Sequence, residues 1–480
     1  MAIPQRWASL GREALAPADT DAADRLAFLL LVAFILVAPW LGSVRSPGGL
    51  AGMAAPVGRL VIPALALAIA AAAFWSRSSY RSLRSFALPV GSILGLALLG
   101  GLQLIPMPDS LLQRFAPVNL EIYHETAELL GLYAKSTPVS RVSLAPRETA
   151  GTVLRLVAYA ALLAAAAHLL RTRPRRRLFT GALLVAGCLH VVVAGALLAT
   201  GSSFRGAFAS ESDFGHYLLV LLLVGFGALW AEVLTNTDRG RDAIDRAEQY
   251  EQRLPPLAAK ALAFATIAAG LVLTGSTCSM GASLLAILFV LALGAGQRRA
   301  WRRAGGPAGA GAAAALVAVR FGAWPPTPFA DIDLSRTLRL SEAGLEAWKT
   351  FPIVGAGLGA FVDAFRRVQP RALPGFVDSA PSNLFQILIT GGAVGAILAV
   401  LAAVSFFWIL LRKWKAQRHR EESALVLAGA GALLAVGLDG IAEFNLGTAV
   451  VPATLACVLG LAIAGADGSA REHAPSSPAA

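Results

Sequence analysis

Long apolar runs recur along the entire chain and alternate with short polar segments. A helix needs about 20 predominantly apolar residues to cross the hydrocarbon core of a bilayer. The runs predict twelve spanning helices, at roughly 25–43, 60–75, 86–105, 150–170, 178–200, 214–234, 260–278, 281–296, 307–322, 384–411, 424–441 and 448–466. The pattern therefore predicts an all-α integral membrane protein.

The ninth predicted span, 307–322, differs from the others because it is short and rich in alanine and glycine. Small residues allow helices to approach closely, and a short apolar stretch matches the bilayer poorly. We expect this segment to be tilted, packed inside the bundle or only partly spanning.

Four basic segments each follow an even-numbered span, so all four fall on the same face of the membrane. They are RSSYRSLRS (77–85), RTRPRRR (171–177), QRRAWRR (297–303) and RKWKAQRHR (412–420). Lys and Arg concentrate in cytoplasmic loops, so this face is expected to be the cytoplasmic one. Both termini then lie inside the cell.

This topology divides the chain into five segments. They are a cytoplasmic N-terminal segment (1–24), spans one to nine (25–319), a large outer loop (320–383), spans ten to twelve (384–466) and a cytoplasmic tail (467–480). Three aspartates precede the first span, which argues against a cleavable signal peptide. Long outer loops usually carry a function, so 320–383 is the first place to look for one.

Composition agrees with a membrane protein, since 56% of the residues are hydrophobic and 15% are charged. A soluble domain carries about 25% charged residues. The net charge of +12 comes from the Arg-rich loops, whose natural counterpart is the anionic lipid of the inner membrane rather than nucleic acid. The cysteines and histidines show no disulfide framework and no metal-ligand spacing, so we expect neither a metal nor a cofactor.

The candidate functional residues are ionisable groups on the outer face, because charge near membrane depth is usually functional. Guanidinium forks bind phosphate oxygens in pairs, so several arginines could hold a diphosphate. The alternative is that they are ordinary solvated loop charges. The candidate arginines are Arg205, Arg336, Arg339, Arg366 and Arg367.

Three carboxylates on the same face are candidates for acid–base chemistry. Asp439 and Glu443 lie in the tight outer turn GLDGIAEFNLG between the last two predicted spans, where an unpaired carboxylate is costly. Asp378 lies just before the tenth span. A structural pairing of Asp439 or Glu443 with an arginine of the large loop is the alternative interpretation.

Five stretches, in this order, resemble the O-antigen ligase and O-antigen polymerase family of bacterial envelope glycosyltransferases. They are SLAPRETAGTVLRLVAYAALL (143–163), FRGAFASESDFGHYL (204–218), GSTCSMGASLLAI (275–287), FPIVGAGLGAFVDAFRRVQP with the following APSNLFQILITGGAVG (351–395), and EFNLGTAVVPATLACVLGLA (443–462). The resemblance covers about 86–466, and its most specific part is 339–395.

The resemblance implies a fold like that of the C-type glycosyltransferases, at the periplasmic face of the bacterial inner membrane. It implies lipopolysaccharide or exopolysaccharide biosynthesis. The donor would be an undecaprenyl-diphosphate-linked glycan, and the recipient an acceptor glycan or lipid A core. It also implies a metal-independent reaction in which arginines hold the diphosphate and a His in an Ala-His-Asn triplet activates the acceptor hydroxyl.

Several polar positions depart from the family pattern. Pro381 and Ser382 stand where the His and Asn of the triplet are expected, and neither can act as a general base near neutral pH. Met280 stands where the family has the Arg of a Ser-Arg-Gly turn. Glu443 replaces an Asp and keeps the carboxylate.

Three functional hypotheses remain open from the sequence. The first is a transferase with Asp378, Asp439 or Glu443 as the base and the candidate arginines on the phosphates. The second is a non-catalytic relative that binds lipid-linked glycan or a partner in polysaccharide assembly. The third is a transporter or flippase, which the absence of matching halves with interrupted helices disfavours.

Overall fold

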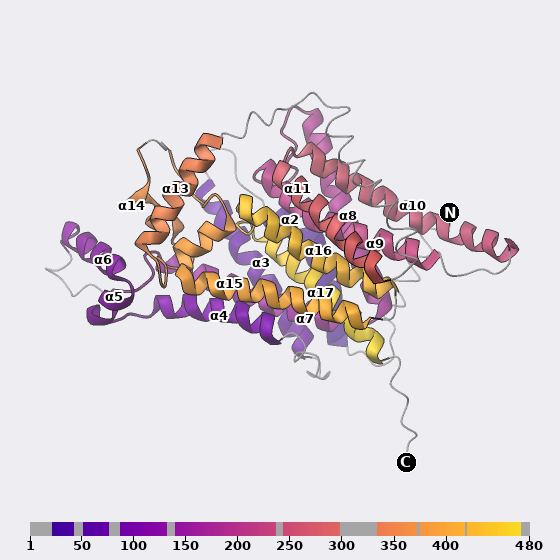
Figure 1. Ribbon diagram of the computed structural model, residues 1–480, viewed down its shortest axis with the longest axis horizontal. Coiled ribbons are helices and arrows are strands. Elements are labelled where there is room, and N and C mark those ends of the chain that lie inside the picture. The colour runs from indigo at the N-terminus through magenta and orange to yellow at the C-terminus, as the bar shows by residue number, and fades with distance from the viewer. Residues whose placement is uncertain are drawn as a thin grey trace, which may run out of the picture.

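The computed structural model describes residues 22–42, 51–75, 87–131, 140–236, 243–297, 334–371, 375–417 and 420–471, and their regular structure is helical. The helices are α2 (Ala22–Gly42), α3 (Ala51–Trp75), α4 (Ala87–Leu104), α5 (Asp109–Phe115), α6 (Pro117–Leu129), α7 (Pro146–Leu169), α8 (Arg173–Ala199), α9 (Glu211–Asn236), α10 (Ala243–Leu273), α11 (Thr277–Gln297), α13 (Leu334–Thr350), α14 (Phe361–Val368), α15 (Asn383–Ala416), α16 (Arg420–Ala442) and α17 (Val450–Arg471). Figure 1 shows their arrangement.

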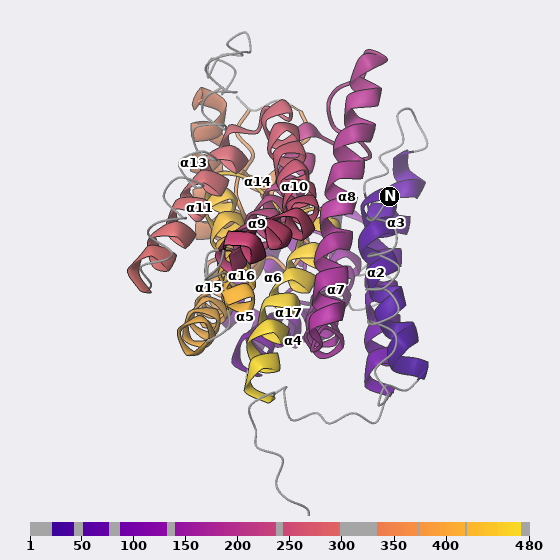
Figure 2. The ribbon, with the colours of Figure 1, turned by 90° about the vertical axis from the view of Figure 1, so that its right-hand side faces the viewer.

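The long helices form a bundle in which neighbours run side by side (Figures 1 and 2). Nine of the described helices are long and apolar enough to cross a membrane, and α3 and α17 contain shorter apolar segments. Every predicted span except 307–322 coincides with a helix, and that span lies outside the described residues. The protein is therefore a multi-pass, all-α membrane protein, while the full number of spans stays a prediction.

Helix α9 is the centre of the bundle because it is apolar on all sides. In the apolar, membrane-spanning part of α9, 94% of the residues are buried inside the protein, against 17% in the same part of α10. A helix without a polar face packs inside a protein. Small residues let α9 approach α16 closely, since a Cβ at Gly227 would lie 2.4 Å from the Cβ of Ala428. This close packing holds α16 against the polar N-terminus of α9.

Helix α15 is broken at Gly392, where φ is +64° and the backbone is not helical. The loop at 352–357 docks into the break, because Ala393 N donates to Pro352 O at 2.9 Å and Ala356 N donates to Ile389 O at 3.0 Å. A Cβ at Gly392 would lie 2.2 Å from Ile353 O, so only glycine fits. Gly355 of this loop packs just as closely, since a Cβ there would lie 2.3 Å from Thr390 O.

Gln103, near the end of α4, completes the hydrogen bonds of this docked loop. Its Nε2 donates to Val354 O at 2.7 Å and to Thr390 O at 3.2 Å, and its Oε1 accepts from Leu358 N at 2.8 Å. Buried backbone groups need such partners. One buried side chain therefore ties α4, the outer loop and α15 together.

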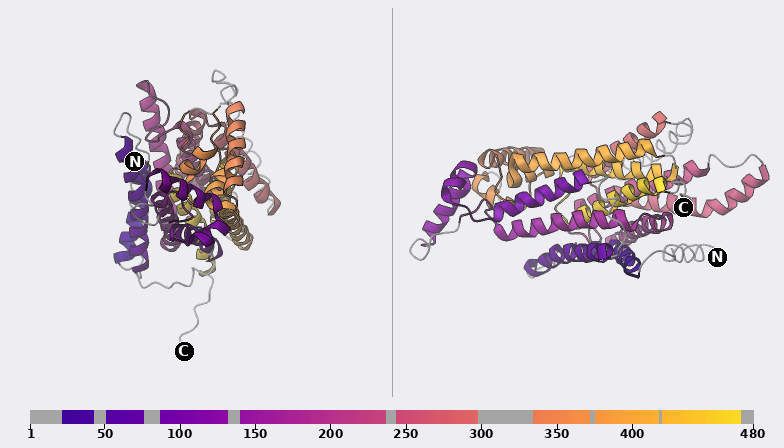
Figure 3. Two further views of the ribbon diagram at one scale, coloured as in Figure 1. Left: turned by 90° about the vertical axis from the view of Figure 1, so that its left-hand side faces the viewer. Right: turned by 90° about the horizontal axis from the view of Figure 1, so that it is seen from below.

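Four short or amphipathic helices, α5, α6, α13 and α14, form a cap at one end of the bundle. Figure 3 shows α5 and α6 beyond the ends of the long helices. The cap has a small apolar core around Phe351, Phe361 and Phe365. Part of it, α13 and α14, comes from the predicted outer loop 320–383.

The opposite end of the bundle is held by buried ion pairs. Arg175 Nη1 lies 2.7 Å from Asp24 Oδ2, and Arg176 Nη2 lies 2.7 Å from Glu422 Oε1. These pairs join the start of α8 to α2 and to α16. The basic segment 171–177 therefore lies at the end of the bundle away from the cap.

Candidate functional site

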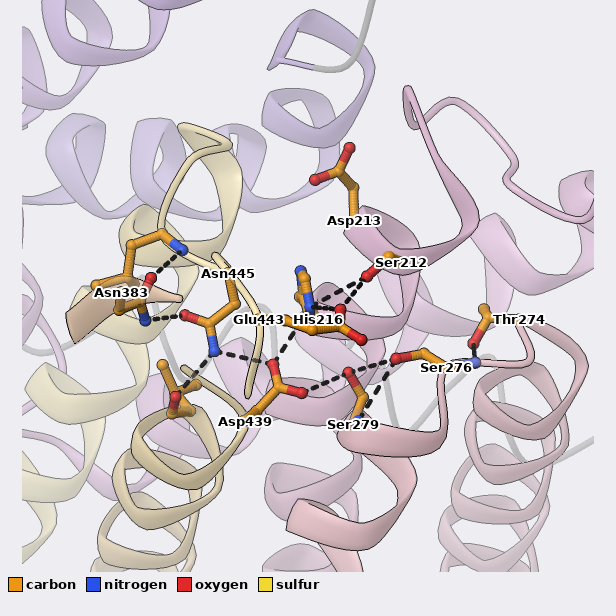
Figure 4. Close-up of polar contacts among 12 residues, drawn as sticks. Ser212, Asp213, His216, Thr274, Ser276, Ser279, Asn383, Asp439, Glu443 and Asn445 are labelled. Atoms are coloured by element: carbon orange, nitrogen blue, oxygen red, sulfur yellow. Dashed lines mark hydrogen bonds and ion pairs between the residues drawn. The ribbon is translucent and has the colours of Figure 1, made fainter. Parts of the chain in front are cut away.

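A polar cluster joins the ends of three helices on the cap side of the bundle (Figure 4). Ser212 and His216 come from the first turns of α9, Ser279 from the first turn of α11, and Asp439 from the last turn of α16. Glu443 directly follows α16. Residues more than 200 positions apart in the sequence thus meet in one site.

His216 is the link between the two carboxyl groups. Its Nε2 lies 2.9 Å from Glu443 Oε2 and 3.3 Å from Asp439 Oδ2. Because both partners are carboxyl oxygens, Nε2 is the nitrogen that carries hydrogen. The other nitrogen, Nδ1, is buried and makes no hydrogen bond to any residue that the structure describes.

Asp439 has a side chain that is fully buried but surrounded by donors. Ser279 Oγ donates to its Oδ1 at 3.0 Å, and Asn445 Nδ2 donates to its Oδ2 at 2.8 Å. A buried carboxyl group without such partners costs several kcal/mol. The hydrogen bonds therefore fix Asp439 in one orientation beside His216.

Among Asp439, His216 and Glu443, Glu443 has the most exposed side chain. Its side chain is 30% exposed, compared with 4% for His216 and 0% for Asp439. Burial raises the pKa of Glu443, but hydrogen bonds from His216 and Ser212 outweigh it and bring the pKa below its usual value. Glu443 is therefore an ionised, oriented carboxylate that a molecule from outside can reach.

The turn between α10 and α11 supplies the hydroxyl groups on one side of the cluster. Ser276 Oγ donates to Ser279 Oγ at 3.0 Å, and Gly275, with φ +70°, makes the reversal possible. Met280 follows in α11 and packs partly buried against the apolar core. An apolar side chain thus stands where the family resemblance placed an arginine.

The candidate arginines are spread over two parts of the cap side. Arg205 is exposed in the turn before α9 and donates to Ala209 O at 3.1 Å, while Arg339 is exposed on α13. Arg336 lies in the first turn of α13, and its side chain is outside the described set.

The two arginines of α14 have partners within the cap. Arg366 lies over the ring of Phe376, 5.2 Å from its centre. Arg367 pairs with Glu125 at 2.8 Å and with Glu121 at 3.3 Å. Arg367 is therefore committed to holding α14 against α6.

The segment before α15 contains the remaining predicted positions. Asp378 is exposed and accepts a hydrogen bond from Ser379 Oγ at 3.1 Å. Pro381 is half-buried, and the buried Ser382 caps α15 by accepting from Phe385 N at 3.3 Å. Ser382 thus has a structural role, which explains why a small hydroxyl residue suits this position.

Sequence reasoning identified Asp439 and Glu443 but missed their partner, His216. A detectable signal was present, because Ser212 and His216 are four residues apart and lie on one face at the start of a span. The packing of α9 against α16 then brings that face to Glu443. Ser279 and Asn383 were missed as well, since neutral polar residues give no such signal alone.

Residues 262–400 match the family model described as O-antigen ligase. No curated protein matches the chain. The matched segment includes Ser279 and Asn383, but His216, Asp439 and Glu443 lie outside it.

Proposed function

We propose that this protein is a membrane glycosyltransferase that moves a glycan from an undecaprenyl-diphosphate carrier to an acceptor at the periplasmic face of the bacterial inner membrane. The observation that carries the proposal is Glu443, an ionised carboxylate, partly exposed and held by His216 and Ser212. An oriented carboxylate of this kind suits a general base. It supplies the chemistry that Pro381 and Ser382 lack.

In the proposed reaction, an acceptor hydroxyl attacks the anomeric carbon of the donor sugar. Its proton passes to Glu443, the new glycosidic bond forms, and the bond from the sugar to the diphosphate breaks. Undecaprenyl diphosphate leaves with the electron pair of that bond. His216, hydrogen-bonded to Glu443 Oε2 at 2.9 Å, keeps the carboxylate in place while the proton moves.

The leaving diphosphate gains negative charge, which arginine stabilises through paired hydrogen bonds. Arg205 and Arg339 suit this role because both are exposed on the cap side, and Arg366 is exposed there as well. Arg205 has the closest position in sequence to the cluster, in the turn that leads into Ser212.

The membrane side follows from the charge distribution. The cluster lies on the cap side, and the basic segment 171–177 lies at the other end of the bundle. Because basic loops stay in the cytoplasm, the cluster would face the periplasm. Lipid-linked glycan would then reach Glu443 from the outer leaflet.

A second candidate function is supported by Met280, Pro381 and Ser382, whose side chains carry neither the charge nor the base expected in the family. In this alternative the protein binds lipid-linked glycan, or a partner in polysaccharide assembly, without catalysis. The two candidates differ in what they require of Glu443, which only a transferase needs as a base.

A deletion strain tests the proposal. We expect lipid-linked glycan to accumulate and surface polysaccharide to disappear, with single repeats indicating a polymerase and long lipid-linked chains a ligase. Glu443→Gln should fail to restore the polymer, whereas Glu346→Gln, which alters an exposed ion pair on α13, should restore it. Full restoration by Glu443→Gln would favour the non-catalytic candidate, and an unchanged glycan pool on deletion would refute both.

A further inference from the structure

Asn383 begins α15 at a point where local hydrogen bonds fix the backbone on both sides. Ser382 caps the helix through Phe385 N, and Gln386 Oε1 accepts from Ala380 N at 3.0 Å. The side chain of Asn383 takes no part in this cap. It points instead toward the turn between α16 and α17, where Asn445 lies (Figure 4).

Asn383 makes two contacts with that turn. Its Nδ2 donates to Asn445 Oδ1 at 2.6 Å, and its Oδ1 accepts from Leu446 N at 3.4 Å. Gly440 provides the space, since a Cβ there would lie 2.1 Å from Asn383 Nδ2. The start of α15 is therefore fitted closely onto the turn that follows Asp439.

The orientation of both amides follows from hydrogen-bond chemistry. Asn445 Nδ2 lies 2.8 Å from Asp439 Oδ2 and 2.8 Å from Val436 O, and both of these atoms are acceptors. The NH2 group of Asn445 must face them, so its oxygen faces Asn383. Asn383 must then present its own NH2 group, because an oxygen there would leave two acceptors in contact.

The chain of polar contacts continues to the proposed base. Asp439 Oδ2 receives Asn445 and also lies 3.3 Å from His216 Nε2, which in turn contacts Glu443. Asn445 is 1% exposed, so water does not replace it. Every step from Asn383 to Glu443 is thus a direct contact between neighbouring side chains.

We propose that Asn383 and Asn445 form a latch that positions Asp439 and His216 beside Glu443, and so couples the segment before α15 to the base. The proposal rests on the proposed function, because it assigns a role toward the same carboxylate. Both asparagines are positioning residues, since they act on Glu443 through Asp439 and His216. Through these two residues, the latch links the end of the predicted outer loop to catalysis.

Two variants of Asn383 test the latch. Asn383→Leu has a similar volume but cannot donate, so Asn445 loses its anchor and can turn away from Asp439. We expect the rate constant per folded molecule to fall by about tenfold. The KM for lipid-linked glycan extracted from the deletion strain should stay unchanged. The protein is assayed in full length, in proteoliposomes.

Asn383→Asp exchanges the donor for an acceptor and adds a negative charge. Besides the lower rate constant, we expect the acidic limb of the pH–rate profile to move to higher pH, because negative charge disfavours ionisation of Glu443. The titratable groups already facing Glu443 are His216 from α9, Asp439 from α16 and the thiol of Cys278 from α11. They are unchanged in this variant.

Gln386→Met is the matched control, because it removes a hydrogen bond to Ala380 in the same segment but none toward Asp439. We expect lower thermal stability with the parent rate constant per folded molecule and the parent pH profile. If both Asn383 variants behave like Gln386→Met while Glu443→Gln is inactive, the latch is wrong and the proposed function stands. Full activity of Glu443→Gln would instead refute the proposed base.

Discussion

At the scale of single residues, the contact between His216 and Glu443 has the clearest consequence for pH dependence. The hydrogen bond from His216 holds the pKa of Glu443 down, and a general base must be deprotonated to act. His216→Ala should therefore raise that pKa and move the acidic limb of the pH–rate profile to higher pH. His216→Gln, which keeps a donor, should lie between the parent and His216→Ala.

The pH–rate profile is measured with lipid-linked glycan at a concentration below its KM, so that it reports the free enzyme. An acidic limb at the same pH in the parent and in His216→Ala would contradict the role given to this contact. Equal profiles would also show that Ser212 alone is enough to orient the carboxylate.

What the sequence revealed at this scale depended on charge. Asp439 and Glu443 could be selected because two carboxylates in a tight turn between spans are unusual. Their partner His216 could not be selected, because the sequence has several histidines near spans. Only the packing of α9 on α16 distinguishes His216 from the others. The partners of the two carboxylates among the described residues include His216, Ser212 and Ser279, and the pairing with an arginine of the large loop stays a prediction.

At the scale of elements, the break in α15 predicts a sharp dependence on one glycine. Gly392→Ala would place a side chain where φ is +64° and where Ile353 O leaves no room. We expect a loss of about 3 kcal/mol or more of folding free energy, read as a lower melting temperature in detergent. Gly437→Ala in α16, where a Cβ meets nothing within 4 Å, is the control and should change little.

The pattern of apolar runs located the helices well because each span carries its own signal. It failed at the turn between α10 and α11, predicted at 278–281. Helix α10 ends at Leu273 and α11 begins at Thr277, because Gly275 adopts a positive φ within a run of small residues that hydropathy does not separate. Helix α10 also begins at Ala243, well before the predicted start at 260, since its first turns are helical but polar.

At the scale of the whole molecule, the account predicts that the cap and the basic end lie on opposite sides of the membrane. In a variant whose three native cysteines are replaced by alanine, Leu129→Cys on α6 should react with a membrane-impermeant maleimide added to spheroplasts. Lys415→Cys, at the end of α15, should react only after the inner membrane is opened. The opposite pattern would place Glu443 on the cytoplasmic side.

The topology is a prediction that the sequence allows, because the positive-inside rule uses local charges. The cap could not be predicted in this way. Its helices α5, α6, α13 and α14 are short or amphipathic, and their packing depends on contacts such as Arg367 with Glu125 that join distant segments. The predicted outer loop 320–383 contributes only part of this cap, since α5 and α6 come from the segment before α7.

The most direct test of the central claim is the release of undecaprenyl diphosphate by the purified protein in proteoliposomes. The donor is lipid-linked glycan from the deletion strain, and the acceptor is the lipid A core or a second lipid-linked glycan from the same strain. We expect release by the parent, and a rate at least about 100-fold lower for Glu443→Gln, because a general base typically contributes that much. Release at equal rates by both proteins, or by neither, would contradict the account of Glu443 as the base of a glycosyltransferase.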